Sequence, residues 1–265
     1  MAPRAKRRLG QHFLTDPRLL GRIADALGAG PEDTVVEIGP GPGGLTAALV
    51  ERAGRVVAIE KDSDLVPALR ARVPAATIVA GDALELDWHA LAGDRFLVAG
   101  NIPYNITSPL IDKALDPVRP ERIVFLVQRE VADRVTAAAG DPDYGALSVG
   151  VQSVARAERL FTVPAGAFRP RPQVDSAVLR LTPLAAPLVT PDEQAQFRRL
   201  TVGLFGFRRK QMLRALRELT GWPADRARVA LDQAGISTEV RPEVLPPSAL
   251  VRLQRALVDG GWAGR

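Results

Sequence analysis

Residues 34–44 have the sequence Thr-Val-Val-Glu-Ile-Gly-Pro-Gly-Pro-Gly-Gly. A short β-branched run passes here directly into a glycine-rich turn, and a helical pattern follows over residues 45–52. Glycines in such a turn let the backbone approach a ligand, and the start of the helix favours a negative group. Gly39, Gly41 and Gly44 have the spacing of a dinucleotide-binding loop. The stretch predicts the first strand, turn and helix of a nucleoside-binding α/β domain, but it does not choose between a nicotinamide dinucleotide and S-adenosylmethionine.

The pattern continues on both sides of this stretch. Before it, Thr15-Asp16-Pro17 predicts a helix that runs to Gly28, because aspartate caps helices and proline suits their first turn. After it, strands are expected at 56–60, 77–80, 96–99 and 123–127, alternating with helices at 65–72, 108–115 and 130–138. This alternation predicts an α/β fold with a parallel sheet covered on both faces. Two later runs, 149–157 and 177–181, are expected to close the sheet as a hairpin-like edge.

The chain is expected to have two domains, because its 265 residues allow one full core and a smaller one. A proline-rich segment over 183–191 is typical of a linker. Beyond it the patterns are helical, at 193–204, 211–219, 224–234 and 248–257. We therefore predict a Rossmann-like α/β domain over residues 1–183 and a small all-α domain over residues 192–265.

The net charge of +5 belongs to the C-terminal part of the chain. Residues 1–183 carry 22 basic and 22 acidic side chains, whereas residues 184–265 carry 13 and 8. Seven basic residues lie within 198–217 with no acid among them, and a second basic run comprises Arg4, Lys6, Arg7 and Arg8. Arginine forks suit phosphate, so the distribution favours a polyanionic partner, although solvated helix faces are also charged.

Composition excludes several classes of site. The chain has no cysteine and only two histidines, His12 and His89, so disulfides, thiolate metal sites and cysteine nucleophiles are ruled out and a histidine zinc site has no basis. No window approaches 18 consecutive apolar residues, and the basic N-terminus lacks the apolar core of a signal peptide. We expect no metal, no membrane association, a cytoplasmic location and a monomer.

Four successive strand ends carry candidate ligand-binding residues, namely Gly39, Glu60, Asp82 and Asn101. Ligands of open α/β sheets gather at the carboxyl ends of the strands, so these residues are expected to form one site. The Glu60 carboxylate can accept hydrogen bonds from ribose hydroxyls, and the Asp82 carboxylate can accept one from an adenine amino group. Taken singly, Asp82 also fits a helix cap and Asn101 a turn.

The turn Asn101-Ile102-Pro103-Tyr104 suits chemistry on an exocyclic amine. The amine of adenine is a poor nucleophile because its lone pair is delocalised into the ring, and two acceptors aimed at its hydrogens would localise that pair. The Asn101 side-chain oxygen can supply one acceptor and a backbone carbonyl of the turn the other. Pro103 stiffens the turn, and Tyr104 offers a flat face for the base. Such a reaction needs positioning rather than a strong base, whereas hydrolytic deamination needs zinc ligands that the chain lacks.

Six ordered motifs give the chain a family resemblance. They are GQHFL at 10–14, EIGPG at 37–41, GDAL at 81–84, NIPYN at 101–105, VQREVADR at 127–134 and FRPRPQVDS at 168–176. Together they resemble the rRNA adenine N6-dimethyltransferase family, and FRRK at 207–210 extends the resemblance into the C-terminal part. The resemblance implies a class I S-adenosylmethionine-dependent methyltransferase domain followed by a small helical domain.

The resemblance also implies roles for individual residues. Those implied for S-adenosylmethionine are Gln11, His12, Leu14, Gly39, Gly41, Glu60, Asp82, Ala83 and Asn101. Those implied for the reaction are Asn101, Pro103, Tyr104 and Phe168, and the rings of Tyr104 and Phe168 would hold a flipped adenine by stacking. Candidates for RNA contacts are Arg169, Arg171, Arg208, Arg209 and Lys210. The chain departs from the family at His12, where Asn is frequent, and at Gln211, where Thr is common.

Two branches of the family share these motifs. One dimethylates two adjacent adenines in the 3′-terminal hairpin of 16S rRNA, and the other modifies 23S rRNA and confers macrolide resistance. Residues 144–148 and 235–245 resemble the first branch, so 16S rRNA in the small subunit or its precursor is the expected partner. The alternatives are the 23S branch, a non-catalytic RNA-binding assembly factor and a nicotinamide oxidoreductase. The intact Asn-Ile-Pro-Tyr turn argues against lost catalysis, and it has no purpose in an oxidoreductase.

Overall fold

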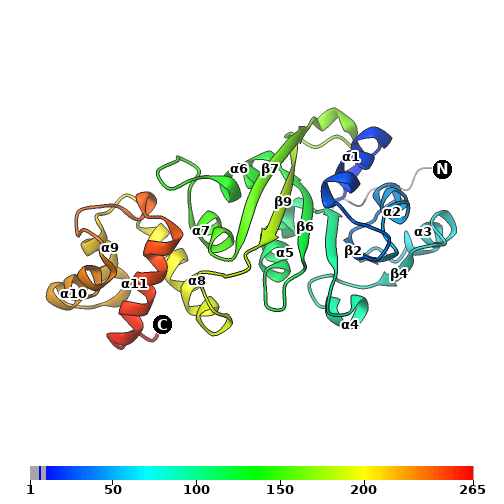
Figure 1. Cartoon of the computed structure of the whole chain (residues 1–265). Coiled ribbons are helices and arrows are strands. Elements are labelled where there is room, and N and C mark those ends of the chain that lie inside the picture. The colour runs from blue at the N-terminus through cyan, green and yellow to red at the C-terminus, as the bar shows by residue number, and fades with distance from the viewer. Residues whose placement is uncertain (1–5, 7–9, 265) are drawn as a thin grey trace. The chain divides into compact units, whose positions relative to one another are not determined.

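The computed structural model describes residue 6 and residues 10–264. It contains a seven-stranded sheet (Figure 1). The strand order is β4-β3-β2-β5-β6-β9-β7. Five strands are parallel: β2 (Thr34–Ile38), β3 (Arg55–Glu60), β4 (Thr77–Ala80), β5 (Leu97–Asn101) and β6 (Arg122–Gln128). β9 (Ser176–Pro183) pairs antiparallel with β6, and β7 (Ala155–Val163) is the edge strand. The predicted α/β fold is confirmed, and the chain reverses its direction of winding between β2 and β5, where doubly wound sheets bind ligands.

The helices between the strands largely begin and end where local chemistry predicts. They are α1 (Pro17–Leu27), α2 (Gly44–Val50), α3 (Val66–Arg72), α4 (Trp88–Ala92), α5 (Thr107–Ala114) and α6 (Arg129–Thr136). The Asp16 carboxylate caps α1 by accepting from two backbone N–H groups, and Gly28 ends it with a φ of 65°. The face of α1 that carries Ile23 and Leu27 is buried in the main core. The five-residue helix α4 was not predicted, because so short a segment shows no periodicity.

A second, two-stranded sheet joins distant segments of the α/β unit. β1 (Phe13–Leu14) pairs antiparallel with β8 (Phe168–Arg169), with Leu14 opposite Phe168. Just beyond β1, the backbone N–H of residue 15 donates to the Ala167 carbonyl at 3.2 Å. The side chains of Leu14 and Phe168 are 8% and 0% exposed and belong to the main hydrophobic core. The segment after residue 10 is therefore held on the segment 167–170.

The prediction of an edge strand over residues 149–157 is wrong. Residues 146–152 form helix α7 (Ala146–Gln152), and the edge strand β7 begins only at residue 155. The Ser148 hydroxyl accepts from the Gly145 N–H at 3.0 Å and donates to the Arg134 carbonyl, so side-chain contacts start a helix that the β-branched Val149 and Val151 do not favour. Residues 177–181 do form a strand, within β9. Because β9 and β7 are the last two strands at one end of the sheet, the predicted hairpin-like closure is confirmed, with its first strand starting later than expected.

Contacts divide the chain into two compact units, residues 1–132 with 157–183 and residues 133–156 with 184–265. The sequence-based division differs for residues 133–156, which it placed in the α/β part. Tyr144 ties this segment to the helical unit. Its hydroxyl donates to the Leu245 carbonyl at 2.8 Å, and its ring packs edge-on against Phe205 at 5.7 Å between centroids.

The helical unit contains α7 and four longer helices, α8 (Pro191–Gly206), α9 (Met212–Thr220), α10 (Ala224–Ala234) and α11 (Pro247–Asp259). Its core is built from leucines, a phenylalanine and a methionine that are almost completely buried: Phe197, Leu200, Leu204, Met212, Leu216, Leu231, Leu250, Leu253 and Leu257. Among the described residues no helix has the length and apolarity needed to cross a membrane.

Arg4, Arg7 and Arg8 of the N-terminal basic run lie outside the described residues.

Candidate active site

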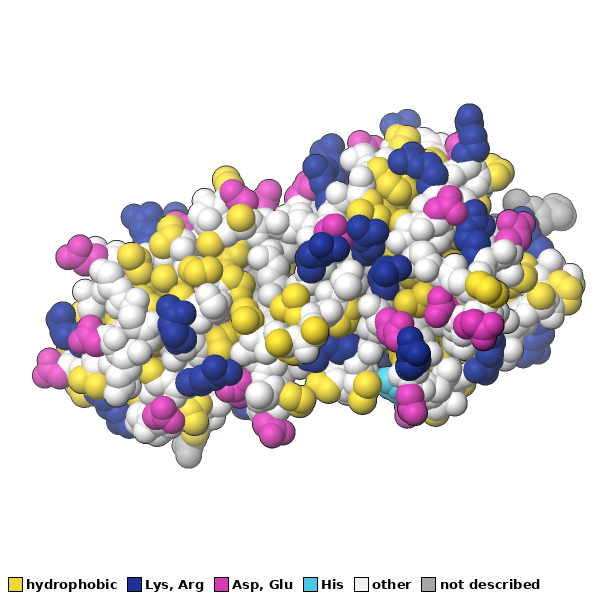
Figure 2. Space-filling view, viewed as in Figure 1, with side chains coloured by type: hydrophobic (Ala, Val, Ile, Leu, Met, Phe, Trp, Pro, Cys, Tyr) yellow, Lys and Arg dark blue, Asp and Glu magenta, His cyan; other side chains and the backbone are white. Residues whose placement is uncertain are grey.

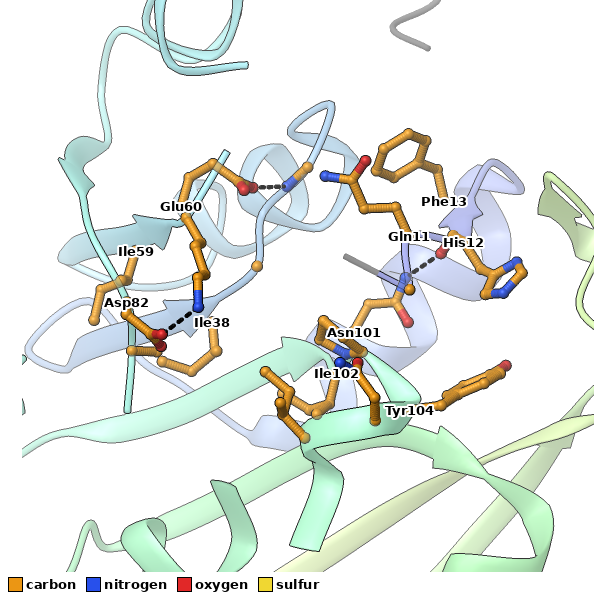
Figure 3. Close-up of a pocket in the computed structure, with 18 of the residues that line it drawn as sticks. Gln11, His12, Phe13, Ile38, Ile59, Glu60, Asp82, Asn101, Ile102 and Tyr104 are labelled. Atoms are coloured by element: carbon orange, nitrogen blue, oxygen red, sulfur yellow. Dashed lines mark hydrogen bonds and ion pairs between the residues drawn. The ribbon is translucent and has the colours of Figure 1, made fainter. Parts of the chain in front are cut away.

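One cavity of the α/β unit brings together the residues at the predicted strand ends (Figure 3). The residues predicted for a cofactor that line it are Gln11, His12, Gly39, Gly41, Glu60, Asp82, Ala83 and Asn101. Pro103 and Tyr104 line it as well. They come from the ends of β2, β3, β4 and β5 and from the segment before β1, so the parallel sheet assembles the site as its topology predicts.

Two residues predicted for the site have side chains that do not line the cavity. Leu14 and Phe168 are not among the residues that line the cavity, because both side chains are buried in the core behind it. Side chains alternate along a strand, so Phe13 faces the cavity while its neighbour Leu14 faces the core. The structure therefore does not place the Phe168 ring where it could stack on a base.

The glycine loop has a backbone that only glycine adopts readily. Gly39, Gly41 and Gly43 have φ values of 67°, 54° and 83°. A Cβ at Gly41 would lie 3.0 Å from the Phe13 ring, and one at Gly39 would lie 3.6 Å from the Asn101 carbonyl oxygen. The loop thus forms a narrow cradle whose backbone is bare of side chains, which fits a nucleoside-containing group lying close against it.

Glu60 ends β3 with its carboxylate almost fully buried at the wall of the cavity. Its Oε2 accepts from the Gly41 N–H at 2.9 Å and its Oε1 from the Asp62 N–H at 2.7 Å. Burial raises the pKa of Glu60, and these two backbone donors oppose the shift. Each carboxylate oxygen keeps a second lone pair, so the group can still accept from a vicinal diol such as that of a ribose.

Asp82, just after β4, is an ionised acceptor. It forms an ion pair with Lys61, and its other oxygen accepts from the Leu84 N–H at 3.0 Å. The hydrogen bond from Lys61 lowers the pKa of Asp82. The carboxylate and the adjoining Ala83 lie at the same end of the cavity, opposite the turn at Asn101, as Figure 3 shows for the labelled side chains.

The side chain of Asn101 is oriented by the backbone of the N-terminal segment. Its Nδ2 donates to the His12 carbonyl at 2.8 Å. A carbonyl can only accept, so this contact assigns the amide nitrogen to that side and turns Oδ1 away as an acceptor. Among the described residues no group donates to Oδ1. The Asn101 side chain therefore presents a free carbonyl-type oxygen at the cavity.

The backbone of the same turn supplies a second acceptor. The Pro103 carbonyl accepts from the Ile106 N–H at 3.1 Å and from the Thr107 hydroxyl at 3.2 Å, so both of its lone pairs are used. The Ile102 N–H donates to the Leu126 carbonyl at 3.1 Å, which fixes the peptide of this residue. Within the described part of the chain nothing donates to the Ile102 carbonyl, which leaves it as the available acceptor of the turn.

Tyr104 is the last residue of this turn, and its side chain is fixed through the hydroxyl group. Its hydroxyl shares a hydrogen bond of 2.7 Å with the buried Ser176 hydroxyl, and burial raises the pKa of the phenol. The Tyr104 ring lines the cavity described above and also a second hollow.

The second hollow adjoins the first and shares four of its lining residues, Gly10, Gln11, His12 and Tyr104. Its other walls are Gln128 at the end of β6 and residues 170–174. Arg171 lies on this wall, whereas the guanidinium of the exposed Arg169 donates to the carbonyls of residues 166 and 168. Gln128 was missed by the sequence analysis, although its place at a strand end is the same signal that identified Asn101.

The three cations predicted to bind RNA are not equivalent. Arg208 donates to Glu243 at 3.0 Å and to the Pro142 carbonyl at 3.0 Å. Lys210 pairs with Glu218. Arg209 is exposed, and no partner for it occurs among the described residues. On the face that Figure 2 shows, basic and acidic side chains are interspersed over the helical unit rather than separated.

A buried carboxyl lies behind the glycine loop. The Glu37 side chain in β2 is 1% exposed, and its Oε2 has no hydrogen-bond partner among the described residues. Burial raises the pKa of Glu37 to about 8, so this group is mostly neutral at pH 7. Among the residues that the structure describes, no cluster of histidine and carboxylate side chains has the arrangement of a metal site.

The chain is similar to known rRNA-modifying enzymes over nearly its full length. A family model described as ribosomal RNA adenine dimethylase matches residues 2–255. Curated relatives named ribosomal RNA small subunit methyltransferase A, from Geobacter metallireducens and Caulobacter vibrioides, are 41% and 43% identical to it. Each alignment covers 97% of this chain, with 97% and 98% of the respective relative.

Solved structures agree with this similarity. A dimethyladenosine transferase from Plasmodium falciparum superposes with a TM-score of 0.81 at 25% identity, covering 95% of this chain and 99% of that one. The 23S rRNA methyltransferase ErmE superposes with a TM-score of 0.72 at 30% identity, covering 93% and 99%. The predicted methyltransferase fold with a helical C-terminal part is thereby confirmed.

Proposed function

Because the chain belongs to the ribosomal RNA adenine dimethylase family, we propose that it dimethylates the N6 amines of two adjacent adenines in the 3′-terminal hairpin of 16S rRNA. It would do so in the cytoplasm, in the small subunit or its precursor. Family membership makes the chain a methyltransferase, so its glycine loop does not belong to a nicotinamide oxidoreductase. The small-subunit target is supported by relatives of that name at 41% and 43% identity, against 30% for the 23S enzyme.

The cavity of the α/β unit fits S-adenosylmethionine as the methyl donor. When bound, this cofactor supplies a methyl group made electrophilic by a positive sulfonium. We assign the bare backbone at Gly39 and Gly41 to its methionine part, the Glu60 carboxylate to its ribose, and the Asp82 carboxylate to its adenine amine. Gln11 and the backbone of His12 line the same cavity and cover it from the N-terminal segment. The side chain of Leu14 is buried in the core, so a contact of this residue with the cofactor would come from its backbone.

The proposed chemistry rests above all on the orientation of Asn101. Its Nδ2 is held by the His12 carbonyl, so Oδ1 is free to accept one hydrogen of the target amine, and the Ile102 carbonyl is free to accept the other. In the first transfer the two acceptors would hold the amine hydrogens in fixed positions and localise the nitrogen lone pair toward the methyl group. The new N–C bond would form as the S–CH3 bond breaks, leaving S-adenosylhomocysteine, and one amine proton would pass to solvent. In the second transfer one acceptor would hold the single remaining N–H. Preorganised acceptors of this kind cost no rearrangement during the reaction. Tyr104 offers its ring to the base once it leaves the helical stack.

RNA docking is proposed for exposed cations of both units. In the helical unit Arg209 is the primary contact among the three predicted cations, because Arg208 and Lys210 already have carboxylate partners. In the α/β unit Arg171, on the wall of the second hollow, is placed to meet a phosphate that flanks the target. Arginine is suited to both roles because its planar fork matches phosphate oxygens.

The proposal is tested by methyl transfer to purified ribosomal subunits that lack the modification. Small and large subunits are incubated separately with the protein and labelled S-adenosylmethionine, and the RNA is digested for mass spectrometry. We expect two N6,N6-dimethyladenosines per 16S rRNA and no label in 23S rRNA. Label found only in the large subunit would assign the chain to the 23S branch, and label in neither would support a non-catalytic role.

A further inference from the structure

His12 occupies the boundary between the two hollows and lines both of them. Its backbone carbonyl accepts from the Asn101 Nδ2 at 2.8 Å. Its side chain turns the other way, and its ring lies against the Tyr104 ring with centroids 5.5 Å apart and planes 25° from parallel. Figure 3 shows both rings projecting to the same side of Asn101. His12 therefore contacts both Asn101 and Tyr104, the two residues that we propose hold the target adenine.

The imidazole of His12 is itself fixed in place. Its Nδ1 lies 2.8 Å from the Pro170 carbonyl oxygen. Because a carbonyl only accepts, this nitrogen must carry the proton of the pair. The ring is thus held at one edge by the segment 170–174 that walls the second hollow and on one face by Tyr104.

One face of the Tyr104 ring is already covered. Its hydroxyl is engaged by Ser176 at 2.7 Å, and one face is covered by the His12 ring. Directly stacked rings have centroids about 4.5–7 Å apart, so the 5.5 Å between these two leaves no room for a third ring. A base can therefore stack only on the opposite face of Tyr104.

We propose that His12 is a positioning residue for the target adenine. Its imidazole packs against one face of the Tyr104 ring, and its backbone carbonyl orients the Asn101 amide. This inference rests on the proposed function and goes beyond the cofactor role that the family resemblance implies for this position. The imidazole, anchored on the Pro170 carbonyl, sets the tilt of the phenol ring. The base then stacks on the free face of Tyr104 with its amine at Asn101 Oδ1.

Three substitutions separate the two features of the imidazole. His12→Asn keeps a donor for the Pro170 carbonyl but has no ring. His12→Phe keeps a ring against Tyr104 but has no donor. His12→Ala removes both. All three leave the backbone carbonyl that orients Asn101 in place, so they test the side chain alone.

The experiment measures initial rates on unmethylated small subunits at saturating S-adenosylmethionine, with calorimetric binding of S-adenosylhomocysteine as the second readout. An aromatic pair of this kind is worth about a 3- to 10-fold effect. We expect kcat to fall by about that factor in His12→Asn and His12→Ala, and to recover to within about 2-fold of wild type in His12→Phe. The KM for subunits and the Kd for S-adenosylhomocysteine should stay within about 2-fold, because the stack forms after docking and away from the cofactor.

Two outcomes would overturn the inference. If His12→Asn is as fast as the wild type, the ring does not position the base. If the Kd for S-adenosylhomocysteine rises as much as kcat falls in all three variants, the side chain serves the cofactor instead. Should His12→Ala fail to fold, the comparison of His12→Asn with His12→Phe still decides. The wild-type rate on small against large subunits reports separately on the proposed function, since the variant ratios are measured on whichever subunit the wild type methylates.

Discussion

In the α/β unit two polar side chains at the strand ends, those of Glu60 and Asn101, are held by backbone groups. The Glu60 carboxylate accepts from two N–H groups, and the Asn101 amide donates to a carbonyl. In the helical unit the prominent cations are held by carboxylates instead, Arg208 by Glu243 and Lys210 by Glu218. Backbone partners come with the fold and are insensitive to salt. Exposed ion pairs are weak, and Arg209 beside them has no partner among the described residues, so this cation is open to a phosphate. The first arrangement suits chemistry on one amine, and the second suits reversible docking on a polyanion.

The largest test of this contrast is Asn101→Ala. If the backbone-held Oδ1 is the acceptor for the target amine, its loss should lower kcat by about 100-fold or more, as for other preorganised groups that act in the transition state. The Kd for S-adenosylhomocysteine should change only a few-fold. Initial rates on small subunits and calorimetry measure the two quantities.

Asn101→Asp is the matched control for that loss. It keeps an oxygen acceptor but replaces the donor to the His12 carbonyl with a second acceptor, so its rate should lie between those of wild type and Asn101→Ala. Methylation by Asn101→Ala at the wild-type rate would disprove the mechanism.

A smaller effect is expected at the glycine cradle. Gly41→Ala forces a side chain onto a φ of 54° and brings Cβ within 3.0 Å of the Phe13 ring. Holding a non-glycine residue in this region costs about 1–2 kcal/mol, so the free loop should relax away from it. Because binding must then restore the strained backbone, the Kd for S-adenosylhomocysteine should rise by about 10-fold. Gly166→Ala, in the same unit, is the control, because its added Cβ meets nothing within 4 Å. Equal Kd values for the two variants would show that the loop is not the cofactor cradle.

The parts of this site that could be predicted follow from one rule of topology. Strand ends of a parallel sheet meet at one edge, so Gly39, Glu60, Asp82 and Asn101 could be grouped from the sequence alone. The resemblance also implied Leu14 and Phe168 for the site, whereas the structure buries both side chains in the core. Local patterns do not reveal that β1 pairs with a strand more than 150 residues away, nor which of two alternating side chains faces the core.

One error of sequence reasoning has a different cause. Residues 149–157 carry a β-branched pattern, but Ser148 and contacts within the helical unit make residues 146–152 a helix. Propensity is a weak prior that tertiary contacts override. The basic run 208–210 shows the same limit, since charge can be counted in the sequence while the carboxylate partners of Arg208 and Lys210 cannot.

In the described part of the chain Arg209 has no carboxylate partner and Arg208 has one, so replacing each arginine should impair a different property, RNA binding at Arg209 and stability at Arg208. Arg209→Ala should weaken binding to small subunits a few-fold and reduce the slope of log affinity against log salt by about 1, because one phosphate contact is lost. Arg208→Ala should mainly lower the thermal stability of the helical unit slightly, because the bonds of Arg208 to Glu243 and to the Pro142 carbonyl are lost and, among the described residues, Glu243 keeps only Arg241 at 3.9 Å. Binding at several salt concentrations and thermal unfolding distinguish the two. A larger salt effect for Arg208→Ala would mean that RNA displaces Glu243 and recruits this arginine.

The smallest effect on activity is expected at Glu37. This residue is also an exception to the contrast between backbone-held and carboxylate-held side chains. This carboxyl of the α/β unit has an oxygen with no hydrogen-bond partner among the described residues, and burial raises its pKa to about 8, against 4.5 for an unperturbed glutamate. The folded protein therefore keeps a proton that the unfolded chain releases. The free energy of unfolding should fall as pH rises from about 4.5 to 8, and Glu37 should contribute a slope of up to about 1.4 kcal/mol per pH unit. Above pH 8 Glu37 should contribute no further pH dependence.

Glu37→Gln, which cannot ionise, should remove that slope and leave the methylation rate within about 2-fold of wild type, since the side chain does not line the cavity. Urea unfolding between pH 5 and 8 measures the slope, with Glu51→Gln, an exposed carboxyl of the same unit, as the control that should leave it unchanged. An unchanged slope in Glu37→Gln would mean that this carboxylate is ionised in the folded protein.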